Sequence, residues 1–314
     1  LRAIVTGLGR APSTVSREAK RNGGDKRYRA VDAHDRATRR RARPQRLKLQ
    51  KNPVLRNYVR VGLEKYWSPE QIAGRLKRDY PTNTRMHISH EAIYHAVYTN
   101  STRKTFPGKV HACLRRAQPL RHGKHYTTRG VWRSQIKEAA PLSKRPAEAE
   151  TREVLGHWEG DLIIGSNTSQ VATIVDRTSR AVDLIKLPSR HAPVVVGCLS
   201  DRIGTYGPDR PTLTLTWDRG VELAAHQDLT AATGLGVYFA DPHSPWQRGS
   251  NENTNGLVRQ YLPKKTDLSL KSQAELYQIA SELNTRPRKC LGYQTPLEVQ
   301  HQLAHQTPSV ALTI

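Results

Sequence analysis

The basic residues of this 314-residue chain gather in its first half, and this asymmetry constrains the fold most strongly. Residues 1–150 hold 35 Lys and Arg against 11 Asp and Glu, whereas residues 151–314 hold 16 of each kind. A surplus of this size is typical of a surface that binds a polyanion, and nucleic acid is the leading candidate. The alternative is a basic surface that is only solvated. We predict a multidomain protein with a nucleic-acid-binding half followed by an ordinary globular half.

Several classes of protein are disfavoured by what the sequence lacks. It contains no long apolar run and no signal peptide, so an anionic membrane surface is a weaker candidate than nucleic acid. Cys113, Cys198 and Cys290 lie far apart without a CxxC pair, which excludes a disulfide framework and a zinc module and fits a reducing cytosol. The chain starts at Leu1, within a helical pattern, and we expect a further helix upstream of it.

Residues 3–24 predict two short helices around a tight turn. Pro12 suits the first position of the second helix, Val15 and Ala19 give it one inward face, and Asn-Gly-Gly at 22–24 ends it. This is the pattern of a helix-turn-helix, whose second helix lies in the major groove of DNA. An amphipathic helix hairpin that binds nothing is the alternative. The side chains expected to face DNA are Ser13, Thr14, Ser16, Arg17, Lys20 and Arg21.

A basic helix is predicted next, within residues 28–46, and Pro44 ends it. Its arginines recur at helical spacing and form one stripe, which suits a row of phosphates rather than base edges. We therefore expect residues 1–150 to bind DNA with a steep salt dependence, and residues 151–314 with almost none. A solvated charged face is the alternative. The stripe consists of Arg36, Arg39, Arg40 and Arg43.

Residues 51–110 predict a second helix-turn-helix. Ser68 and Gln71 form a capping box around Pro69, and Ser89 caps a following helix. This segment is less basic than residues 1–50, so a packing or dimerisation unit is an open alternative. The histidines near the second helix fit exposed polar positions better than a metal site. Residues 111–150 are rich in Lys, Arg and Pro, which predicts an extended basic linker.

The pattern changes at residue 154, where short apolar strands begin. Strands are expected within 155–165, 170–187, 212–220 and 236–241, the second of these ranges holding two strands around a polar turn. Helices are expected at 191–207 and 221–234, and another at 272–284 with helical spacing of its apolar residues. Three strands in a meander followed by alternating helices and strands predict an α/β domain with helices packed on a mixed sheet.

Two acids stand out in this half. Asp161 lies in a strand that is otherwise apolar, where a lone carboxylate is costly unless it is paired or binds a cation. Asp218 ends a strand just before Gly220, a position where ligand-binding residues gather in open α/β sheets. Either acid alone could be a turn or cap residue. If the first and fourth strands are neighbours, the two carboxylates meet, and a cation is needed to keep both ionised.

Glu252 is the third candidate. A helix that begins near Asn251 places Glu252, Asn255 and Arg259 on one polar face. A glutamate in a first helical turn is also stabilised by the helix dipole, so this stretch alone favours a simple helix-start residue.

Four segments in order resemble the catalytic core of bacterial insertion-sequence transposases of the IS-thirty family: GHWEGDLIIG, TWDRGVELAAH, HSPWQRGSNENTNGLVRQYLPK and LNTRPRKCLGYQTP. The 33 residues between Asp218 and Glu252 match the spacing of that family. The segments GRAPSTVSREAKRN and WSPEQIAGRL with HEAIYHAVY resemble its N-terminal DNA-binding motifs. The resemblance spans nearly the whole chain.

The resemblance implies a ribonuclease-H-like catalytic core, a mixed five-stranded sheet with flanking helices, in residues 151–269, and a helical extension in residues 270–314. It implies a DDE triad of Asp161, Asp218 and Glu252 that holds two Mg²⁺ ions, with Mn²⁺ as a substitute. Asn255 and Arg259 are then expected to face DNA. The implied activity is binding of the element's terminal inverted repeats, followed by cleavage and strand transfer. A homodimer or larger oligomer in the bacterial cytoplasm, associated with the nucleoid, is expected.

The chain departs from the family pattern at Arg219, where the family usually has Asn after the second acid. A cation there could weaken metal binding or contact DNA, so an inactive or domesticated relative is one alternative. A DNA-binding regulator whose second half dimerises or binds a ligand is another, although such a protein has no use for carboxylates at strand ends.

Overall fold

The computed structural model describes residues 7, 9–24, 26–41, 47–98, 106, 110–115, 140–241 and 244–306. Contacts divide the chain into two compact units, Leu1–Lys51 and Asn52–Ile314. Within the described residues, no helix is both long and apolar enough to cross a bilayer.

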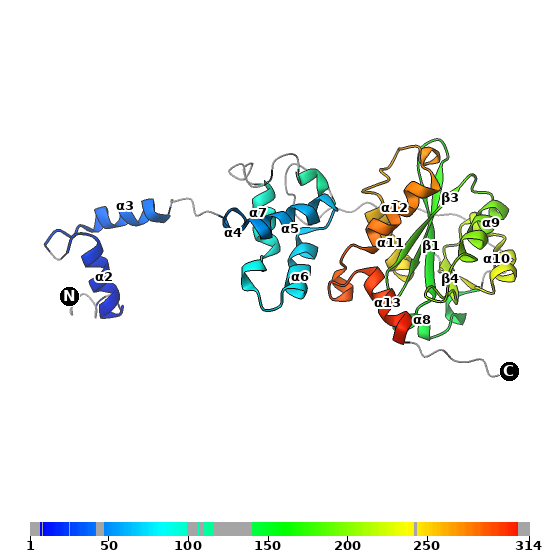
Figure 1. Ribbon diagram of the computed structural model, residues 1–314, viewed down its shortest axis with the longest axis horizontal. Helices are drawn as coiled ribbons and strands as arrows, with labels where there is room; N and C mark the ends of the chain where they lie inside the picture. Colours follow the sequence, from blue (N-terminus) through cyan, green and yellow to red (C-terminus); the bar gives the residue numbers. More distant parts are fainter. Residues whose placement is uncertain are drawn as a thin grey trace. The chain divides into compact units, whose positions relative to one another are not determined.

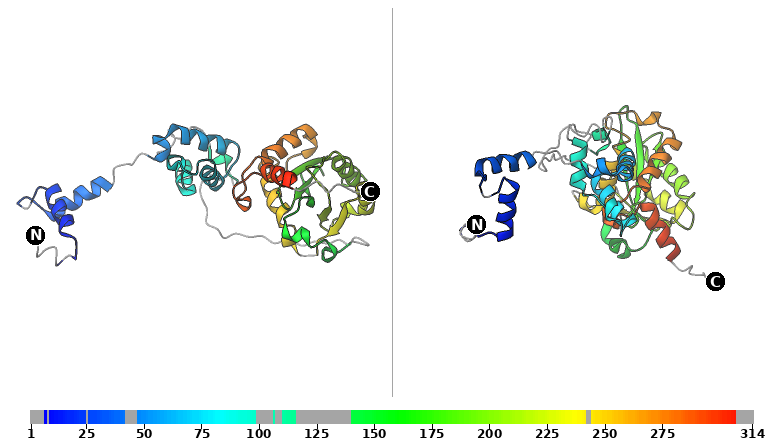
Figure 2. Two further views of the ribbon diagram at one scale, coloured as in Figure 1. Left: turned by 60° about the horizontal axis from the view of Figure 1, so that its bottom comes forward. Right: turned by 60° about the vertical axis from the view of Figure 1, so that its left-hand side comes forward.

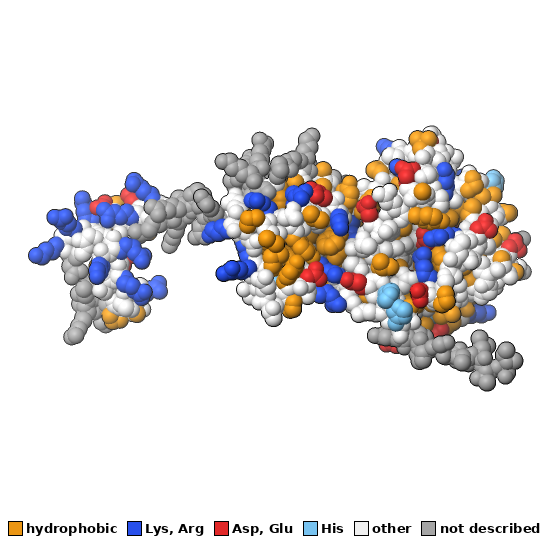
Figure 3. Space-filling view, in the orientation of Figure 1, with side chains coloured by type: hydrophobic (Ala, Val, Ile, Leu, Met, Phe, Trp, Pro, Cys, Tyr) orange, Lys and Arg blue, Asp and Glu red, His pale blue; other side chains and the backbone are white. Residues whose placement is uncertain are grey.

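The first unit is helical, with α2 at Pro12–Arg21, α3 at Ala30–Arg41 and α4 at Lys48–Lys51. As predicted, Pro12 opens α2 and Asn22 is its C-cap, after which Gly23 and Gly24 turn the chain at positive φ. Lys and Arg side chains are spread over the face of this unit that Figure 3 shows. Most of the predicted first helix of the hairpin, the side chain of Arg40 and the whole of Arg43 lie outside the described residues.

The second unit begins with a helical bundle, α5 at Pro53–Glu64, α6 at Pro69–Asp79 and α7 at His90–Tyr98. The capping box of Ser68 and Gln71 is formed, and the Ser89 hydroxyl accepts the backbone N–H of Ala92. The bundle is built on side chains with no exposed surface: Leu55, Val59, Leu63, Ile72, Leu76 and Ile93. Two 3₁₀ turns, Thr84–Met86 and Val110–Cys113, accompany these helices.

The bundle packs on the last part of the chain through α6. Arg75 forms two hydrogen bonds of 2.7 Å with the carboxylate of Glu298. Gly74 lacks the Cβ that would lie 2.3 Å from the ring of Tyr293, so the ring contacts the helix backbone directly. These contacts support the packing alternative for α6, while the predicted domain boundaries within this unit stay predictions.

A mixed five-stranded sheet follows, in the order β3-β2-β1-β4-β5 (Figure 1). Strands β1 (His157–Ile164), β2 (Gln170–Asp176) and β3 (Val182–Leu187) are antiparallel neighbours. Strands β4 (Thr214–Trp217) and β5 (Gly236–Phe239) run parallel to each other, and β4 runs parallel to β1. The meander, the alternating layout and the adjacency of the first and fourth strands are confirmed.

Helices cover both faces of the sheet (Figures 1 and 2). One face packs on α9 (Ala192–Ile203) and α10 (His226–Thr233), the other on α11 (Gly249–Val258) and α12 (Gln273–Asn284). Short α8 (Glu148–Thr151) precedes the sheet, and α13 (Pro296–Gln306) follows α12.

Two helix starts differ from the prediction. α10 begins at His226, because residues Val221–Leu223 form a tighter 3₁₀ turn that buries Leu223 in the core. α11 begins at Gly249 rather than near Asn251, which leaves Arg248 as its N-cap. Glu252 still lies in the first turn of α11.

Candidate active site

Asp161 and Asp218 come together because β1 and β4 are parallel neighbours. Glu159 pairs with Thr216 across these strands, and the alternation of side chains turns both acids toward the face that α11 covers. The guanidinium of Arg248 bridges the two carboxylates. Its Nη2 lies 3.3 Å from Asp218 Oδ2, and its Nη1 lies 3.7 Å from Asp161 Oδ1. The two carboxylates thus meet at one guanidinium, which the sequence did not predict; the neighbouring strands that bring them together were predicted.

The carboxyl group of Asp161 is less acidic than an ordinary aspartate. Burial raises its pKa to about 6, the Arg248 guanidinium opposes this shift, and the carboxylates of Asp218 and Glu222 add to it. The group accepts hydrogen bonds from the backbone N–H of Leu162 and from the Asn255 amide, each at 2.9 Å. These bonds fix the direction of a carboxylate that already lies among other acids.

Glu252 stands apart from this pair. It is exposed in the first turn of α11, and it forms no hydrogen bond or ion pair with another described residue. Among the described residues, no three His, Cys, Asp or Glu side chains gather closely enough to hold a metal ion. The structure therefore brings together two of the three predicted acids.

The helix that carries Glu252 is attached to β1 by two carboxylates on one strand face. Glu159 accepts the backbone N–H of Asn251 at 2.9 Å, and Asp161 accepts the side-chain amide of Asn255, one turn later. The hydroxyl of Thr173, the partner of Asp161 on β2, lies 3.1 Å and 2.9 Å from the amide oxygens of the same two asparagines. The start of α11 is thus fixed over the strands.

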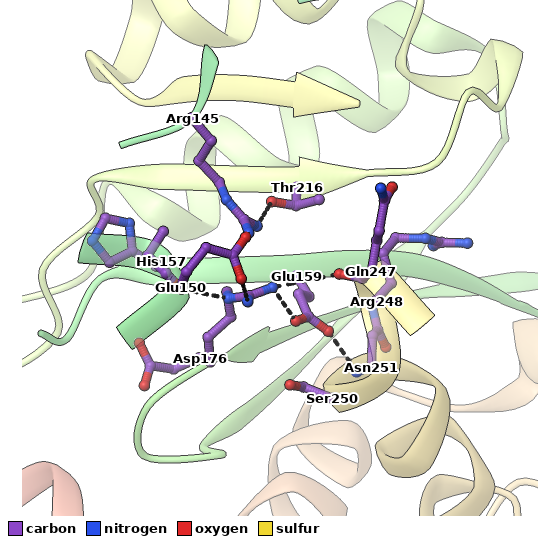
Figure 4. A network of polar contacts seen from close by, with 12 residues as sticks. Arg145, Glu150, His157, Glu159, Asp176, Thr216, Gln247, Arg248, Ser250 and Asn251 are labelled. Carbon is purple, nitrogen blue, oxygen red and sulfur yellow. Dashed lines mark hydrogen bonds and ion pairs between the residues drawn. The ribbon is translucent and has the colours of Figure 1, made fainter. Parts of the chain in front are cut away.

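A buried ion pair supports this attachment (Figure 4). Arg177 Nη1 lies 2.6 Å from Glu159 Oε1, and both side chains have almost no exposed surface. The same guanidinium donates to the carbonyl oxygens of Ala149 and Gln247, at 3.0 and 3.4 Å. Burial lowers the pKa of Arg177 and the charge of Glu159 opposes the shift. Arg177 therefore ties α8 and the turn before α11 to the centre of the sheet.

Two glycines leave room for the side chains around the acids. A Cβ on Gly160 would lie 2.1 Å from the indole of Trp217, a residue with no exposed surface. A Cβ on Gly220 would lie 2.1 Å from the carboxylate of Glu222. The indole N–H of Trp217 lies 3.2 Å from that carboxylate. Glu222 is thereby held beside the pair of aspartates.

Comparison with known proteins places this arrangement in a family. The integrase core domain family matches residues 151–245, a range that includes Asp161 and Asp218 and ends before Glu252. The transposase of insertion sequence element IS30A from Escherichia coli strain K12 is 46% identical over 95% of this chain and 78% of its own length. The chain belongs to the IS30 family of transposases. The transposase of IS1086 from Cupriavidus metallidurans is also 46% identical, over 96% of this chain and 89% of its own length.

A solved structure, the catalytic core domain of BIV integrase, aligns at 22% identity with a TM-score of 0.37, over 48% of this chain and 97% of that one.

In this IS30-family transposase, the predicted DNA-facing residues of α2 are all exposed: Ser13, Thr14, Ser16, Arg17, Lys20 and Arg21. Arg36 and Arg39 on α3 are exposed as well. Asn255 and Arg259 have partners inside the fold. Asn255 donates to Asp161, and Arg259 Nη2 donates to the carbonyl oxygen of Ile164 at 2.9 Å. Arg219, the departure from the family pattern, is half-buried beside Asp218.

Three residues of the site were missed by the sequence analysis. The sequence could have indicated Glu159, because a residue two positions before Asp161 in a strand lies on the same face of the sheet as Asp161. No sequence pattern indicated Arg177 or Arg248, because each of them joins segments that lie far apart in the sequence.

Proposed function

We propose that this transposase cleaves and joins DNA at a metal centre formed by Asp161, Asp218 and Glu252. The observation that carries the proposal is the parallel pairing of β1 with β4, which brings Asp161 and Asp218 to one guanidinium. The 46% identity to transposases over nearly the whole chain supports DNA as the substrate.

The two aspartates suit a divalent cation, as is general for the DDE transposases and integrases. Their carboxylate oxygens are the ligands that Mg²⁺ prefers, and a cation already lies where the two groups meet. When bound, a pair of Mg²⁺ ions supplies the activation of the attacking oxygen and the stabilisation of the leaving oxygen in phosphoryl transfer. The two-ion site, with Mn²⁺ as a substitute, is part of the proposal.

The protein's own residues orient the carboxylates. Asn255 fixes the direction of Asp161, and the Glu159–Arg177 pair holds the N-terminus of α11, from which Glu252 projects into solvent. Arg248 lies at the same point and offers its guanidinium to the phosphate that reacts. In this scheme, Glu252 completes the ligand set that the aspartates begin.

The basic first unit would bind the terminal inverted repeats of the element. Its exposed α2 and α3 side chains support a helix-turn-helix that reads the major groove, followed by a helix that contacts phosphates. Because two transposon ends must meet before strand transfer, we propose that the active form is a homodimer or larger oligomer, associated with the bacterial nucleoid.

A cleavage and joining assay on the element's ends, with Mg²⁺ or Mn²⁺, tests the site. Asp161→Ala, Asp218→Ala and Glu252→Ala should each lower activity by more than about 100-fold while DNA binding is kept. Asp201→Ala removes an exposed acid of α9 and should leave activity unchanged. If the three site variants all retain wild-type activity, the assignment is wrong.

The alternative is a relative that binds DNA without cutting it, and Arg219 is the residue that favours it. Replacing Arg219 with Asn restores the usual family residue. If the cation weakens metal binding, Arg219→Asn should lower the Mn²⁺ concentration needed for half-maximal cleavage and leave DNA affinity unchanged. If Arg219 contacts DNA, the same variant should weaken DNA binding instead.

A further inference from the structure

Four arginines gather along one side of α11 and the turn that follows it: Arg115, Arg180, Arg286 and Arg288, named here the arginine cluster. Three of them contact that side directly. Arg180 donates to the Ser250 hydroxyl, Arg115 lies 3.4 Å from the Asn253 amide oxygen, and Arg286 lies 2.7 Å from that of Gln260. Ser250 and Asn253 lie about 60° apart around α11, Gln260 lies in the turn after it, and Glu252 lies about 100° from Asn253 around the helix.

None of these arginines forms an ion pair with a carboxylate of a described residue. Their hydrogen-bond acceptors are all neutral, including the Gln71 amide for Arg286 and the Leu283 carbonyl for Arg288. The acids nearest to Arg180 already have partners, because Glu159 binds Arg177, and Asp176 accepts backbone N–H groups of its own turn. Within the described part of the chain, these four positive charges therefore have no paired carboxylate.

Two members of the cluster are also buried. Arg286 is 1% exposed and Arg288 is 5% exposed. Burial, together with the smaller effect of neighbouring members of the cluster, lowers the pKa of Arg286 to about 9 and that of Arg288 to about 10. No described residue offers a hydrogen-bond partner to the buried Nε atoms of Arg180 and Arg288. A buried cation without a counter-charge is strongly unfavourable, so this cluster is suited to an anion.

The cluster opens to solvent on one side. Arg115, Asn253 and Cys290 are exposed there, and Arg180 is half-buried. Gly256 makes room for the outer guanidinium, since a Cβ at this position would lie 2.2 Å from Arg115 Nη2. An anion can therefore reach Arg115 and Arg180 from outside, while Arg286 and Arg288 supply positive potential from beneath.

We propose that the arginine cluster binds phosphodiester groups of a DNA strand that passes along α11. The planar guanidinium fork matches the phosphate oxygens, and Arg115, which contacts Asn253, would hold such a strand near Glu252, the preceding residue. This inference rests on the proposed function for the identity of the anion. Through Arg180, Arg286 and Arg288 it assigns a DNA contact to residues 151–314, although these residues are electrically neutral as a whole.

The test is equilibrium binding of DNA by the full chain in EDTA, so that no cleavage occurs. The probes are a duplex of the element's terminal repeat and a scrambled duplex of equal length. Arg115→Gln and Arg180→Gln should each weaken binding to both probes by about 3- to 10-fold, and each should reduce the slope of log K against log salt by about 1. Equal losses on both probes are expected, because phosphates carry no sequence.

Arg202→Gln is the matched control. It removes the same charge from α9, where Arg202 is paired with Asp183, and should leave affinity and slope unchanged. Thermal unfolding of each variant checks the fold. Wild-type affinity and slope in the Arg115→Gln, Arg180→Gln double variant would overturn the inference, as would an equal loss in the control.

A second variant tests the contribution of Arg115 to DNA binding without removing a charge. Gly256→Ala raises helix propensity in α11 but displaces the Arg115 guanidinium. It should weaken DNA binding to the extent that Arg115→Gln does, with no loss of thermal stability. Unchanged binding would count against the cluster.

Cleavage by the wild type is measured separately. If the wild type does not cleave and the cluster variants still weaken DNA binding, the proposed function fails and the cluster assignment stands. If the wild type cleaves and these variants bind normally, only the cluster assignment fails.

Discussion

Two acids two residues apart on β1 have different roles because their surroundings differ. Glu159 is fully buried, and its two oxygens are taken by Arg177 and by the N–H of Asn251. Asp161 lies nearer the end of the strand among other carboxylates, with Arg248 as its nearest cation. Glu159 holds the helix, whereas Asp161 remains available for chemistry.

Asp161 should lower the stability of the fold at neutral pH. Its pKa of about 6 in the folded chain exceeds the ordinary 3.8, so the ionised form costs free energy above pH 6, and the cost vanishes as the pH falls toward 3.8. Asp161→Asn should raise the free energy of unfolding by about 1–3 kcal/mol at pH 7.5 and by little at pH 4. Urea titrations at both pH values measure this, with Asp201→Asn as an exposed control. An equal gain at both pH values would contradict the assignment.

Gly160 should not tolerate a side chain. The indole of Trp217 fills the space of its Cβ, and both residues adjoin the site aspartates. Gly160→Ala should lower the free energy of unfolding by about 1–3 kcal/mol or more, and should lower cleavage as well. Gly197→Ala on α9 is the control, because its Cβ would meet nothing within 4 Å, and it should stabilise the chain by about 0.5–1 kcal/mol. Chemical denaturation of both variants measures these changes in the free energy of unfolding.

At the scale of elements, the geometry of the site depends on how α11 packs on the sheet. The helix is rich in Asn, Gly and Ser, so its own propensity is weak, and its position is fixed by polar contacts with β1 and β2. The sequence predicted the helix and the first-turn position of Glu252. It did not predict the contacts that hold the helix in place, because they involve Arg177, in the turn after β2, and Arg248, in the turn before α11.

The Glu159–Arg177 pair should matter for cleavage beyond its effect on stability. Glu159→Gln alone leaves Arg177 buried without its main counter-charge and should cost about 3–5 kcal/mol. The double variant Glu159→Gln, Arg177→Met should recover part of that stability, yet cleavage should stay at least about 10-fold below wild type, because a small misplacement of Glu252 is amplified in the rate. Mn²⁺ binding, followed by the loss of the free-ion EPR signal, should weaken in parallel.

A second ion pair, between a buried aspartate and a partly exposed arginine, supplies the control for this prediction. Asp183 and Arg202 join β3 and α9 at 2.6 Å, in the core on the opposite side of the sheet from α11. The double variant Asp183→Asn, Arg202→Met should lose comparable stability but keep cleavage and Mn²⁺ binding. If both double variants lose activity in proportion to stability, the Glu159–Arg177 pair has only a structural role.

At the scale of the whole molecule, the charge asymmetry predicts where most of the salt dependence arises. Arg36 and Arg39 are exposed on α3 in the basic first unit. Replacing both with Gln should reduce the slope of log K against log salt by about 2, to the same extent on specific and scrambled DNA. Arg60→Gln, which removes an exposed arginine already paired with Glu64, should change the slope little. If the Arg36→Gln, Arg39→Gln variant has an unchanged slope, the arginine stripe of α3 is only a solvated surface.

The sequence by itself determined the charge asymmetry, the α/β order of the second half and the candidate acids, because each follows from local composition, periodicity or motif spacing. Only the tertiary structure decided that β1 lies beside β4, that Arg248 bridges the aspartates, and that Arg177 and Glu159 hold α11. It also gathered arginines from positions as far apart as 115 and 288 beside one helix. Buried charges pair across space rather than along the chain, so their partners become visible only once the chain is folded.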